Sequence, residues 1–267
     1  MTRSLRRRFV ATTALVAGSL LLGAWAPASA QTVDELKKKG TINVGMLVDF
    51  PPYGTVDAQN NPDGYDADVA KLLAKDLGVK LNLVPVTGPN RIPFLLTNKV
   101  DVLVASLAVT PERAKQVQFS RPYSAATIVL YAPKKANIKA PADLKGQRVA
   151  VARASTQDTA LTAIAPEGTD IRRFDDDASA MQALLSGQVD AIGCSTTVAA
   201  QIAKRAGDAY ENKLVLRQQF MAVAMRPNQA DLLKATNDFV AKNTANGELS
   251  KLYQKWLATP LPSLPSE

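Results

Sequence analysis

The chain has 267 residues, 46% of them hydrophobic, so it can bury either one large core or two smaller ones. Its formal net charge is +8, but the basic residues form no stripe interleaved with aromatic side chains, which argues against nucleic acid as a partner. Histidine is absent and Cys194 is the single cysteine, which excludes an intrachain disulfide. We expect neither a metal nor a cofactor.

The first 30 residues have the pattern of a secretory signal peptide. Four arginines lie in positions 3–8, an apolar stretch covers 9–25, and Ala28-Ser29-Ala30 is a typical cleavage site. We therefore expect cleavage after Ala30, a periplasmic location, and a formal charge that falls from +8 to +4. The alternative is a membrane anchor, but polar and small residues within 12–19 interrupt a stretch that is already short for a bilayer. The arginine run also resembles a twin-arginine signal, so the export route stays open.

The next part of the chain alternates strand and helix patterns. We expect a helix over 33–39, a strand over 41–47, a helix over 65–77, a strand over 80–86, a helix over 90–98 and a buried strand over 100–105. This order predicts an α/β fold with a parallel sheet, in which ligands bind beyond the carboxyl ends of the strands. Phe50, Asn90 and residues 106–110 fall at those ends. Phe50 can either cover a ligand or pack in the core.

Residues 110–113 form a predicted anion site. Thr110 is a typical N-cap, and Pro111 is favoured at the first helical position. The first N–H groups of a helix lack intrahelical partners, and Arg113 can add two parallel hydrogen bonds to a carboxylate. The alternative is a capped surface helix with a solvated arginine. Arg91, at the positive end of its own helix, indicates either a second acidic contact or an exposed side chain.

After Tyr123 the strand and helix patterns start again. We expect strands over 127–132, 147–152, 189–193 and 214–225. We expect helices over 141–144, 229–244 and 247–257, a further helix that begins at 155, and another that ends near 185. Ser155-Thr156-Gln157 begins a helix with hydroxyl and N–H groups available, and Ser195 follows a strand. Asp175-Asp176-Asp177 either complements a helix dipole or directs one carboxylate into a cleft. The prolines of 260–267 predict a disordered tail.

Together these motifs resemble the family 3 extracellular solute-binding proteins, the periplasmic receptors of polar amino-acid ABC importers. The matching stretches run in family order and are 40–45, 52–53, 64–70, 92–95, 100–101, 110–113, 119–123, 143–146, 183–191 and 255–256. The resemblance implies a two-lobed, type II-like periplasmic binding protein fold, in which each lobe has a mixed, mainly parallel sheet flanked by helices. Two hinge strands would join lobe 1, residues 31–124 and 222–259, to lobe 2, residues 125–221.

The resemblance also implies how a ligand is held. An arginine and a helix N-terminus hold its α-carboxylate, two further positions receive its α-ammonium, and an aromatic ring stacks on it. The implied contacts are Arg113, Ser155 and Thr156 for the carboxylate, Ser106 and Ala108 for the ammonium, and Phe50 for the stacking ring. Gln157, at the same helix start, is a further candidate contact.

Several positions depart from the family pattern. Relatives usually have an aspartate where this chain has Ser195, and that aspartate pairs the ligand's ammonium. A serine supplies no counter-charge, and a buried ammonium without one costs about 3 to 5 kcal/mol. Either the ligand is not an ordinary α-amino acid, or another acid such as Asp177 replaces the aspartate. Asn90-Arg91 resembles glutamate/aspartate-binding members, but Leu47 stands where those have a further arginine. Gly88 stands where other relatives have a second aromatic ring that stacks on the ligand.

We therefore expect a monomeric periplasmic protein that binds a small carboxylate-bearing, amino-acid-like solute and delivers it to the membrane permease of an ABC importer. The alternative is a lyase resembling cyclohexadienyl dehydratase. Its general acid would have to be a carboxylate of raised pKa or a lysine, because no histidine is present to serve as the acid or to activate Ser155, Thr156, Ser195 or Cys194. A sensor ectodomain is disfavoured because no second membrane segment follows Trp256. We expect no enzymatic activity.

Overall fold

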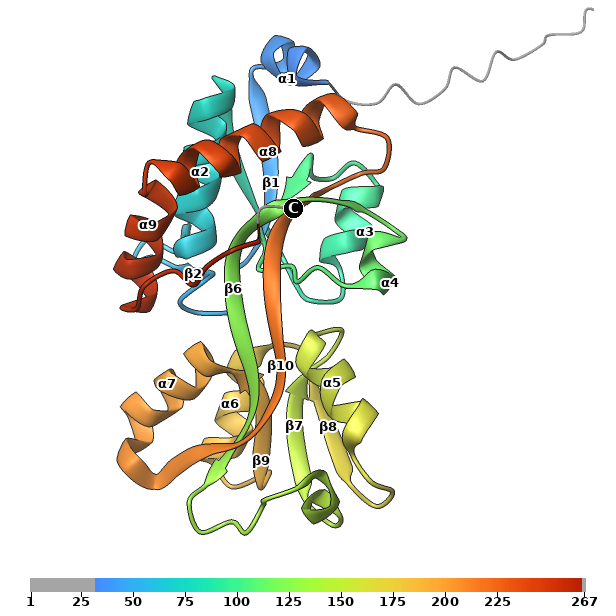
Figure 1. Cartoon of the computed structure of the whole chain (residues 1–267), viewed down its shortest axis with the longest axis vertical. Helices are drawn as coiled ribbons and strands as arrows, with labels where there is room; N and C mark the ends of the chain where they lie inside the picture. The colour runs from blue at the N-terminus through green and yellow to red at the C-terminus, as the bar shows by residue number, and fades with distance from the viewer. Residues whose placement is uncertain (1–31, 266–267) are drawn as a thin grey trace, which may run out of the picture.

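The computed structural model describes residues 32–265. Two lobes are joined by two long strands, with lobe 1 at the top of Figure 1 and lobe 2 at the bottom. The predicted signal peptide and its cleavage site lie outside the described residues. Within residues 32–265, every helix is too short or too polar to span a bilayer.

Lobe 1 is assembled from both ends of the described chain. Its elements are α1 (Val33–Lys39), β1 (Thr41–Leu47), β2 (Thr55–Val56), β3 (Pro62–Asp63), α2 (Tyr65–Leu77), β4 (Lys80–Val86), α3 (Arg91–Leu96), β5 (Val102–Leu103), α4 (Pro111–Ala114), α8 (Ala230–Ala245) and α9 (Glu248–Leu257). β1 pairs in parallel with β4 and with β5, as the alternation of strands and helices predicts.

Lobe 2 repeats the same arrangement with a contiguous stretch of chain. Its elements are η1 (Pro141–Leu144), β7 (Arg148–Ala152), α5 (Thr156–Ile164), β8 (Asp170–Phe174), α6 (Asp177–Leu185), β9 (Ala191–Ser195), α7 (Thr196–Ala206) and η2 (Gly207–Ala209). β7 pairs in parallel with β8 and β9. The sequence does not predict β8 or α7. β8 is an edge strand whose arginines, Arg172 and Arg173, are exposed and pair with aspartates, so it shows no run of apolar residues.

Two antiparallel strands of sixteen residues each, β6 (Gln118–Pro133) and β10 (Tyr210–Met225), run from one lobe into the other (Figure 1). They unite both lobes in one eight-stranded sheet of order β4-β1-β5-β10-β6-β9-β7-β8. The predicted two-strand hinge is confirmed, but β6 begins before the predicted strand 127–132. The sequence pattern does not predict this extension, because Pro122, like any proline, cannot donate a backbone hydrogen bond to a strand ladder. It is tolerated here because β9 pairs only with residues 128–131 of β6, which leaves the other edge at Pro122 unpaired.

The ladder between β6 and β10 is irregular between Met221 and Ala222, and irregularities of this kind let paired strands bend. The lobe boundaries 31–124, 222–259 and 125–221 stay a prediction. Residues 260–265 carry no regular secondary structure, and Leu261 packs against the core. The predicted disorder of 260–267 likewise stays a prediction.

Tyrosine side chains in the core of lobe 1 form hydrogen bonds to the backbone of the hinge strand β6. Tyr65 Oη donates to Tyr123 O (2.7 Å), while Tyr53 Oη (3.3 Å) and Tyr253 Oη (3.0 Å) both reach Ala125 O of β6. These rings are buried, and Tyr65 also contacts the rings of Tyr53, Tyr123 and Tyr253. The hinge strand therefore leaves lobe 1 from a fixed position.

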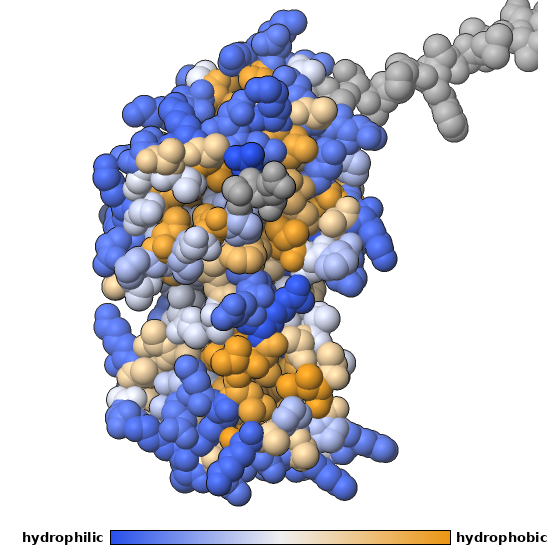
Figure 2. All heavy atoms as spheres, in the orientation of Figure 1, coloured by the Kyte–Doolittle hydropathy of each residue, from blue (hydrophilic) through white to orange (hydrophobic). Residues whose placement is uncertain are grey.

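Figure 2 shows that the visible surface is mostly hydrophilic, with apolar atoms gathered on the face of lobe 2. β10 crosses this face in Figure 1, and its Val215 is 69% exposed.

Candidate ligand-binding site

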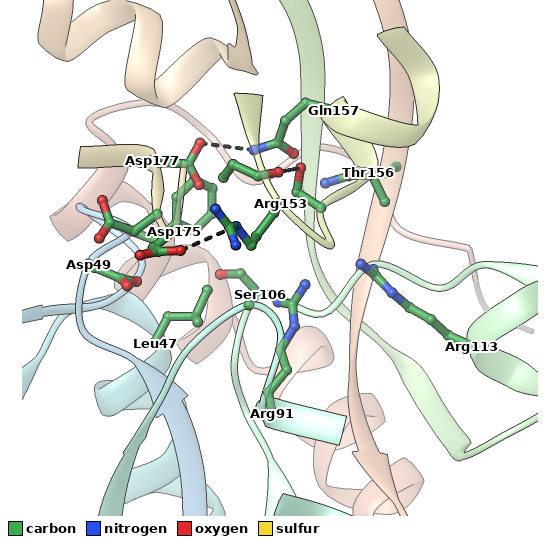
Figure 3. A pocket seen from close by; sticks show the side chains of 16 residues that line it. Leu47, Asp49, Arg91, Ser106, Arg113, Arg153, Thr156, Gln157, Asp175 and Asp177 are labelled. Carbon is green, nitrogen blue, oxygen red and sulfur yellow. Dashed lines mark hydrogen bonds and ion pairs between the residues drawn. The ribbon is translucent and has the colours of Figure 1, made fainter. Parts of the chain in front are cut away.

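A cavity lies between the lobes, beyond the carboxyl ends of β1, β4, β7 and β8, where the parallel-sheet rule places ligands (Figure 3). Most of the predicted site residues line it, whereas Asn90, Ala108 and Ser195 do not. The lining residues are Leu47, Asp49, Phe50, Gly88, Arg91, Ser106, Arg113, Ala152, Arg153, Ser155, Thr156, Gln157, Asp175, Asp176, Asp177 and Gln219.

Arg113 reaches the cavity from α4. As predicted, Thr110 caps this helix, with its Oγ1 accepting a hydrogen bond from Arg113 N (3.3 Å), and Pro111 is the first helical residue. α4 has only four residues, so its dipole is weak. The side chain of Arg113, and not the helix end, therefore carries the positive charge at this position.

The guanidinium of Arg113 contacts both lobes. Its Nη1 donates to Ala108 O in lobe 1 (3.0 Å), and its Nη2 donates to Ala154 O in lobe 2 (3.1 Å). Burial, with the positive charges of Arg91 and Arg217 nearby, lowers the pKa of Arg113 to about 9. Both acceptors are uncharged carbonyl oxygens, and within residues 32–265 the guanidinium forms no ion pair. An anion entering the cavity would supply the missing negative charge.

The N-terminus of α5 also faces the cavity. Ser155 is its N-cap, and the Oγ atom both accepts from Asp158 N (3.1 Å) and donates to Ala152 O. Thr156 Oγ1 donates to Gln219 Oε1. The expectation of free hydroxyl groups is therefore wrong, because the protein itself engages both. What α5 offers an anion is the set of N–H groups in its first turn, which have no intrahelical partners.

The three consecutive aspartates before and at the start of α6 have different partners. Their contacts are Asp175 Oδ1 with Arg153 Nε (3.2 Å), Asp176 Oδ1 with Ser179 N (2.6 Å) and Asp177 Oδ1 with Gln157 Nε2 (2.9 Å). The two alternatives from the sequence, a helix-capping carboxylate and a carboxylate in a cleft, therefore each describe a different aspartate. Asp176 caps the helix, and Asp177 is buried at the cavity.

Asp49 and Asp177 both have raised pKa values. Burial and the charge of Asp49 raise the pKa of Asp177 to about 7, against the hydrogen bond from Gln157. Burial and the charge of Asp176 raise the pKa of Asp49 to about 6. Figure 3 shows Asp49, Asp175 and Asp177 together on one side of the cavity and Arg113 on the other. The cavity is therefore acidic at one end and basic at the other.

Arg91 is buried between the two ends, with 6% of its surface exposed, so the alternative of an exposed arginine is wrong. Its Nη1 donates to Ala105 O (2.9 Å). Burial lowers its pKa to about 10, while Asp177, Asp66 and Asp49 oppose that change. The protein itself therefore places negative charge around Arg91.

Ser106 lies on the floor of the cavity in a left-handed conformation with φ of 46°. Its Oγ donates to Asp66 Oδ2 (2.7 Å), and its N donates to Tyr123 Oη (3.2 Å). Tyr123 Oη in turn donates to Asp66 Oδ1 (2.9 Å). This network holds the Ser106 hydroxyl oxygen in place, with lone pairs still able to accept from an ammonium.

Three further predicted residues have other neighbours. Phe50 lines the cavity and also stacks on Tyr53 with ring centroids 5.2 Å apart, so it is a core residue and a cleft residue at once. Asn90 Oδ1 accepts from Thr87 N (2.8 Å) and closes the turn before α3. Ala108 contributes only the carbonyl that holds Arg113.

Sequence reasoning assigned no ligand contact to Asp49, Arg153 or Gln219. Asp49 and Arg153 come just after β1 and β7, so a strict use of the strand-end rule would have found them. Gln219 is a polar residue that is buried in a hinge strand. A polar side chain at that position was the signal by which the sequence could have indicated a site residue.

Residues 42–259 match the family model for bacterial extracellular solute-binding proteins, family 3. The chain belongs to this family. The predicted solute-binding function is thereby confirmed, as are the predicted two lobes.

Relatives of this family 3 protein include the L-cystine-binding protein TcyJ of Escherichia coli strain K12, which is 32% identical over 84% of this chain and 85% of its own. A solved solute receptor for L-cysteine from Neisseria gonorrhoeae is 32% identical, with a TM-score of 0.79, over 85% of this chain and 94% of its own. A solved ancestral amino-acid-binding protein, described as a precursor of cyclohexadienyl dehydratase, is 35% identical, with a TM-score of 0.78, over 84% of this chain and 99% of its own.

Ser195, where the family resemblance implies an aspartate, is fully buried and caps α7. Its Oγ accepts from Val198 N (3.2 Å) and pairs with Thr197 Oγ1 (2.6 Å). The capping hydrogen bond turns the Oγ into the helix and away from the cavity.

Replacing Ser195 with alanine should lower the free energy of unfolding of this family 3 protein by about 1 kcal/mol, because the cap of α7 is lost. Urea denaturation measures the change, and Ser195→Gly should lose less, because glycine is a better N-cap residue than alanine. An unchanged unfolding free energy for Ser195→Ala would contradict the capping role.

Proposed function

We propose that this protein is the periplasmic solute-binding component of an ABC importer and binds an amino-acid-like zwitterion between its lobes. The observation that carries the proposal is the polarity of the cavity, with Arg113 at one end and Asp49 and Asp177 at the other. A ligand with a carboxylate and an ammonium complements both ends. Relatives named for L-cystine and L-cysteine support an amino acid.

In this proposal Arg113 binds the carboxylate. Two of its five N–H groups are used by carbonyl oxygens, which leaves three donors for a ligand. The first-turn N–H groups of α5, at Thr156 and Gln157, come from the opposite lobe. A carboxylate held by both would therefore draw the lobes together.

Asp177 takes the ammonium in place of the aspartate that Ser195 replaces. It is buried at the cavity, and Gln157 Nε2 fixes its Oδ1 atom. The lone pairs of Ser106 Oγ are a second acceptor for the same group. Ligands that lack a cationic group would add no positive charge beside Asp177, which shares Arg91 with Asp49 and Asp66 in a buried site.

Closure also requires contacts between the lobes outside the cavity. Gln201 Nε2 of α7 donates to Pro51 O, in the loop after β1, at 2.6 Å. Arg113 spans the lobes from the other side of the cavity. These bonds join the two lobes around the cavity.

A lyase activity is the second candidate, because Asp177 is a carboxylate of raised pKa, as an acid catalyst would need. Binding without catalysis is the better supported function. The named relatives are binding proteins, and the ancestral neighbour is itself called an amino-acid-binding protein. Incubation with a cyclohexadienyl substrate, followed by chromatography, separates the two: product formation would establish the lyase, and unchanged substrate would exclude it.

A thermal-shift screen of residues 31–267 tests the proposed function. The compounds are the L-amino acids, L-cystine, and their decarboxylated and deaminated analogues. A ligand at about 100 times its Kd adds roughly 2.7 kcal/mol to the free energy of unfolding. We expect stabilisation by an intact amino acid and loss of it in both analogues. Equal stabilisation by the decarboxylated analogue would overturn the role of Arg113, and no stabilisation by any compound would overturn the amino-acid assignment.

A further inference from the structure

Two carboxylates face the cavity from opposite lobes. Asp49 follows β1 in lobe 1, and Asp177 is the first residue of α6 in lobe 2. Both lie on the side of the cavity away from Arg113 (Figure 3). The charge of Asp49 acts on Asp177, so the two groups interact across the interface between the lobes.

Positive charge is scarce around this pair. The titratable or charged side chains that surround it are Arg91 of α3, Asp66 of α2, Tyr123 of β6, Arg153 after β7, Asp175 and Asp176 before α6, and Cys194 of β9. Of the two arginines, Arg153 is already paired with Asp175. Among residues 32–265, the arginine whose charge acts on Asp49, Asp66 and Asp177 together is Arg91. The acidic end of the cavity therefore carries more negative than positive charge.

In the free protein, protonation of the carboxylates can reduce this excess of negative charge. With pKa values of about 6 and about 7, Asp177 is about half protonated at pH 7, and Asp49 takes up its proton as the pH falls to 6. A cation placed between two carboxylates stabilises their ionised forms and lowers both pKa values. The same cation would also remove the repulsion between the two lobes at this point.

We infer that Asp49 and Asp177 bind the cationic group of the ligand between them, one carboxylate from each lobe, and that their protons leave as the lobes close. This rests on the proposed function, because it needs a ligand in the cavity. It adds Asp49 to the ligand contacts, and it makes binding of an amino acid a proton-releasing reaction.

The expected pH dependence follows from the direction of this exchange. In acid the two carboxylates are protonated, so a cationic group must displace protons before it can bind, and Kd rises. For pKa values of about 6 and about 7 that fall well below 6 on binding, Kd should be about 20-fold larger at pH 6 than at pH 8. A simple carboxylate without a cationic group should bind no more weakly at pH 6.

Isothermal titration calorimetry tests the inference on the wild-type protein, residues 31–267. The probe is the L-amino acid, L-cystine included, that stabilises the protein most in the screen. At pH 6.5, titrations in two buffers with different ionisation enthalpies should give release of about one proton per ligand, for pKa values of about 6 and about 7. This measurement needs no variant and does not depend on how any variant folds.

Two variants assign the protons. The Asp49→Asn and Asp177→Asn double variant should lose most of the pH dependence, with a change in Kd between pH 6 and pH 8 of about twofold or less. The control is Asp238→Asn, which removes a carboxylate outside the cavity. Asp238 is paired with Lys234, and 66% of its side chain is exposed, so the full pH dependence should remain. Circular dichroism establishes that each variant is folded.

The outcomes separate this inference from the proposed function. Amino-acid binding without proton release and without pH dependence would overturn the paired-carboxylate subsite and leave the proposed function intact. The same result follows if the double variant keeps the full pH dependence. If no amino acid binds at all, both are overturned.

Discussion

Replacing Arg113 with alanine should raise the Kd for a carboxylate-bearing ligand by about 100- to 1,000-fold. Within residues 32–265, the guanidinium forms hydrogen bonds to the carbonyl oxygens of Ala108 and Ala154 and forms no ion pair. A bound carboxylate would therefore lose its main counter-charge inside a partly buried cavity. The variant also removes a hydrogen bond between the lobes, which adds to the loss.

Calorimetric titration of the best ligand from the screen measures the effect of Arg113→Ala. Arg113→Lys keeps the charge but loses the two parallel donors, so its Kd should lie between those of the wild type and the alanine variant. Arg121→Ala removes an exposed arginine outside the cavity and controls for the general loss of positive charge. Wild-type affinity in Arg113→Ala would overturn the carboxylate assignment.

Replacing Asp177 with asparagine should stabilise the free protein at pH 8 by about 2 to 4 kcal/mol. The pKa of Asp177 is raised from 3.8 to about 7, so the folded protein binds more protons than the unfolded chain between about pH 4 and pH 7. The wild type therefore loses stability as the pH rises through this range, and the loss is complete above about pH 7. Asparagine cannot ionise, and its Oδ1 can keep the hydrogen bond from Gln157.

Urea denaturation at pH 4, 6 and 8 measures this gain. The difference between Asp177→Asn and the wild type should be largest at pH 8 and small at pH 4, where the aspartate is protonated in the folded protein and partly protonated in the unfolded chain. Asp175→Asn, which removes an exposed and paired carboxylate, should show no such gain. A destabilised Asp177→Asn at pH 8 would show that the carboxylate is stabilised as an anion, contrary to its raised pKa. The stabilised variant should at the same time bind amino acids more weakly.

The strand and helix alternation of lobe 1 and the helix start at Thr110 were predictable because local patterns determine them. The full length of β6 was not, because the effect of Pro122 depends on whether a third strand pairs at that point. α7 was missed because it begins directly after β9, where Ser195 was interpreted as a candidate ligand contact at the end of a strand and not as a helix cap.

The candidate site divides in the same way. The positions of Arg113, Thr156 and Asp177 at the cavity follow from the strand-end rule and from the family resemblance. The partners of each side chain do not follow, because several groups compete for the same polar atoms. Thr156 hydrogen-bonds to Gln219 from a distant strand, and Arg91 draws its counter-charge from three acids on other elements. Such choices depend on tertiary contacts between residues far apart in the sequence.

The order in which the two halves of the molecule can fold follows from the way lobe 1 is assembled. β5 pairs with Ala224 near the end of β10, and Tyr253 of α9 donates to Ala125 O, so lobe 1 cannot complete its sheet or its core without residues 224–257. The β7, β8 and β9 ladder of lobe 2 is made within one continuous stretch. Long-range pairing is slow to form because the intervening chain must first be ordered. During refolding, lobe 2 should therefore gain amide protection first, and ligand binding should appear only with the slower closure of lobe 1 around the C-terminal helices.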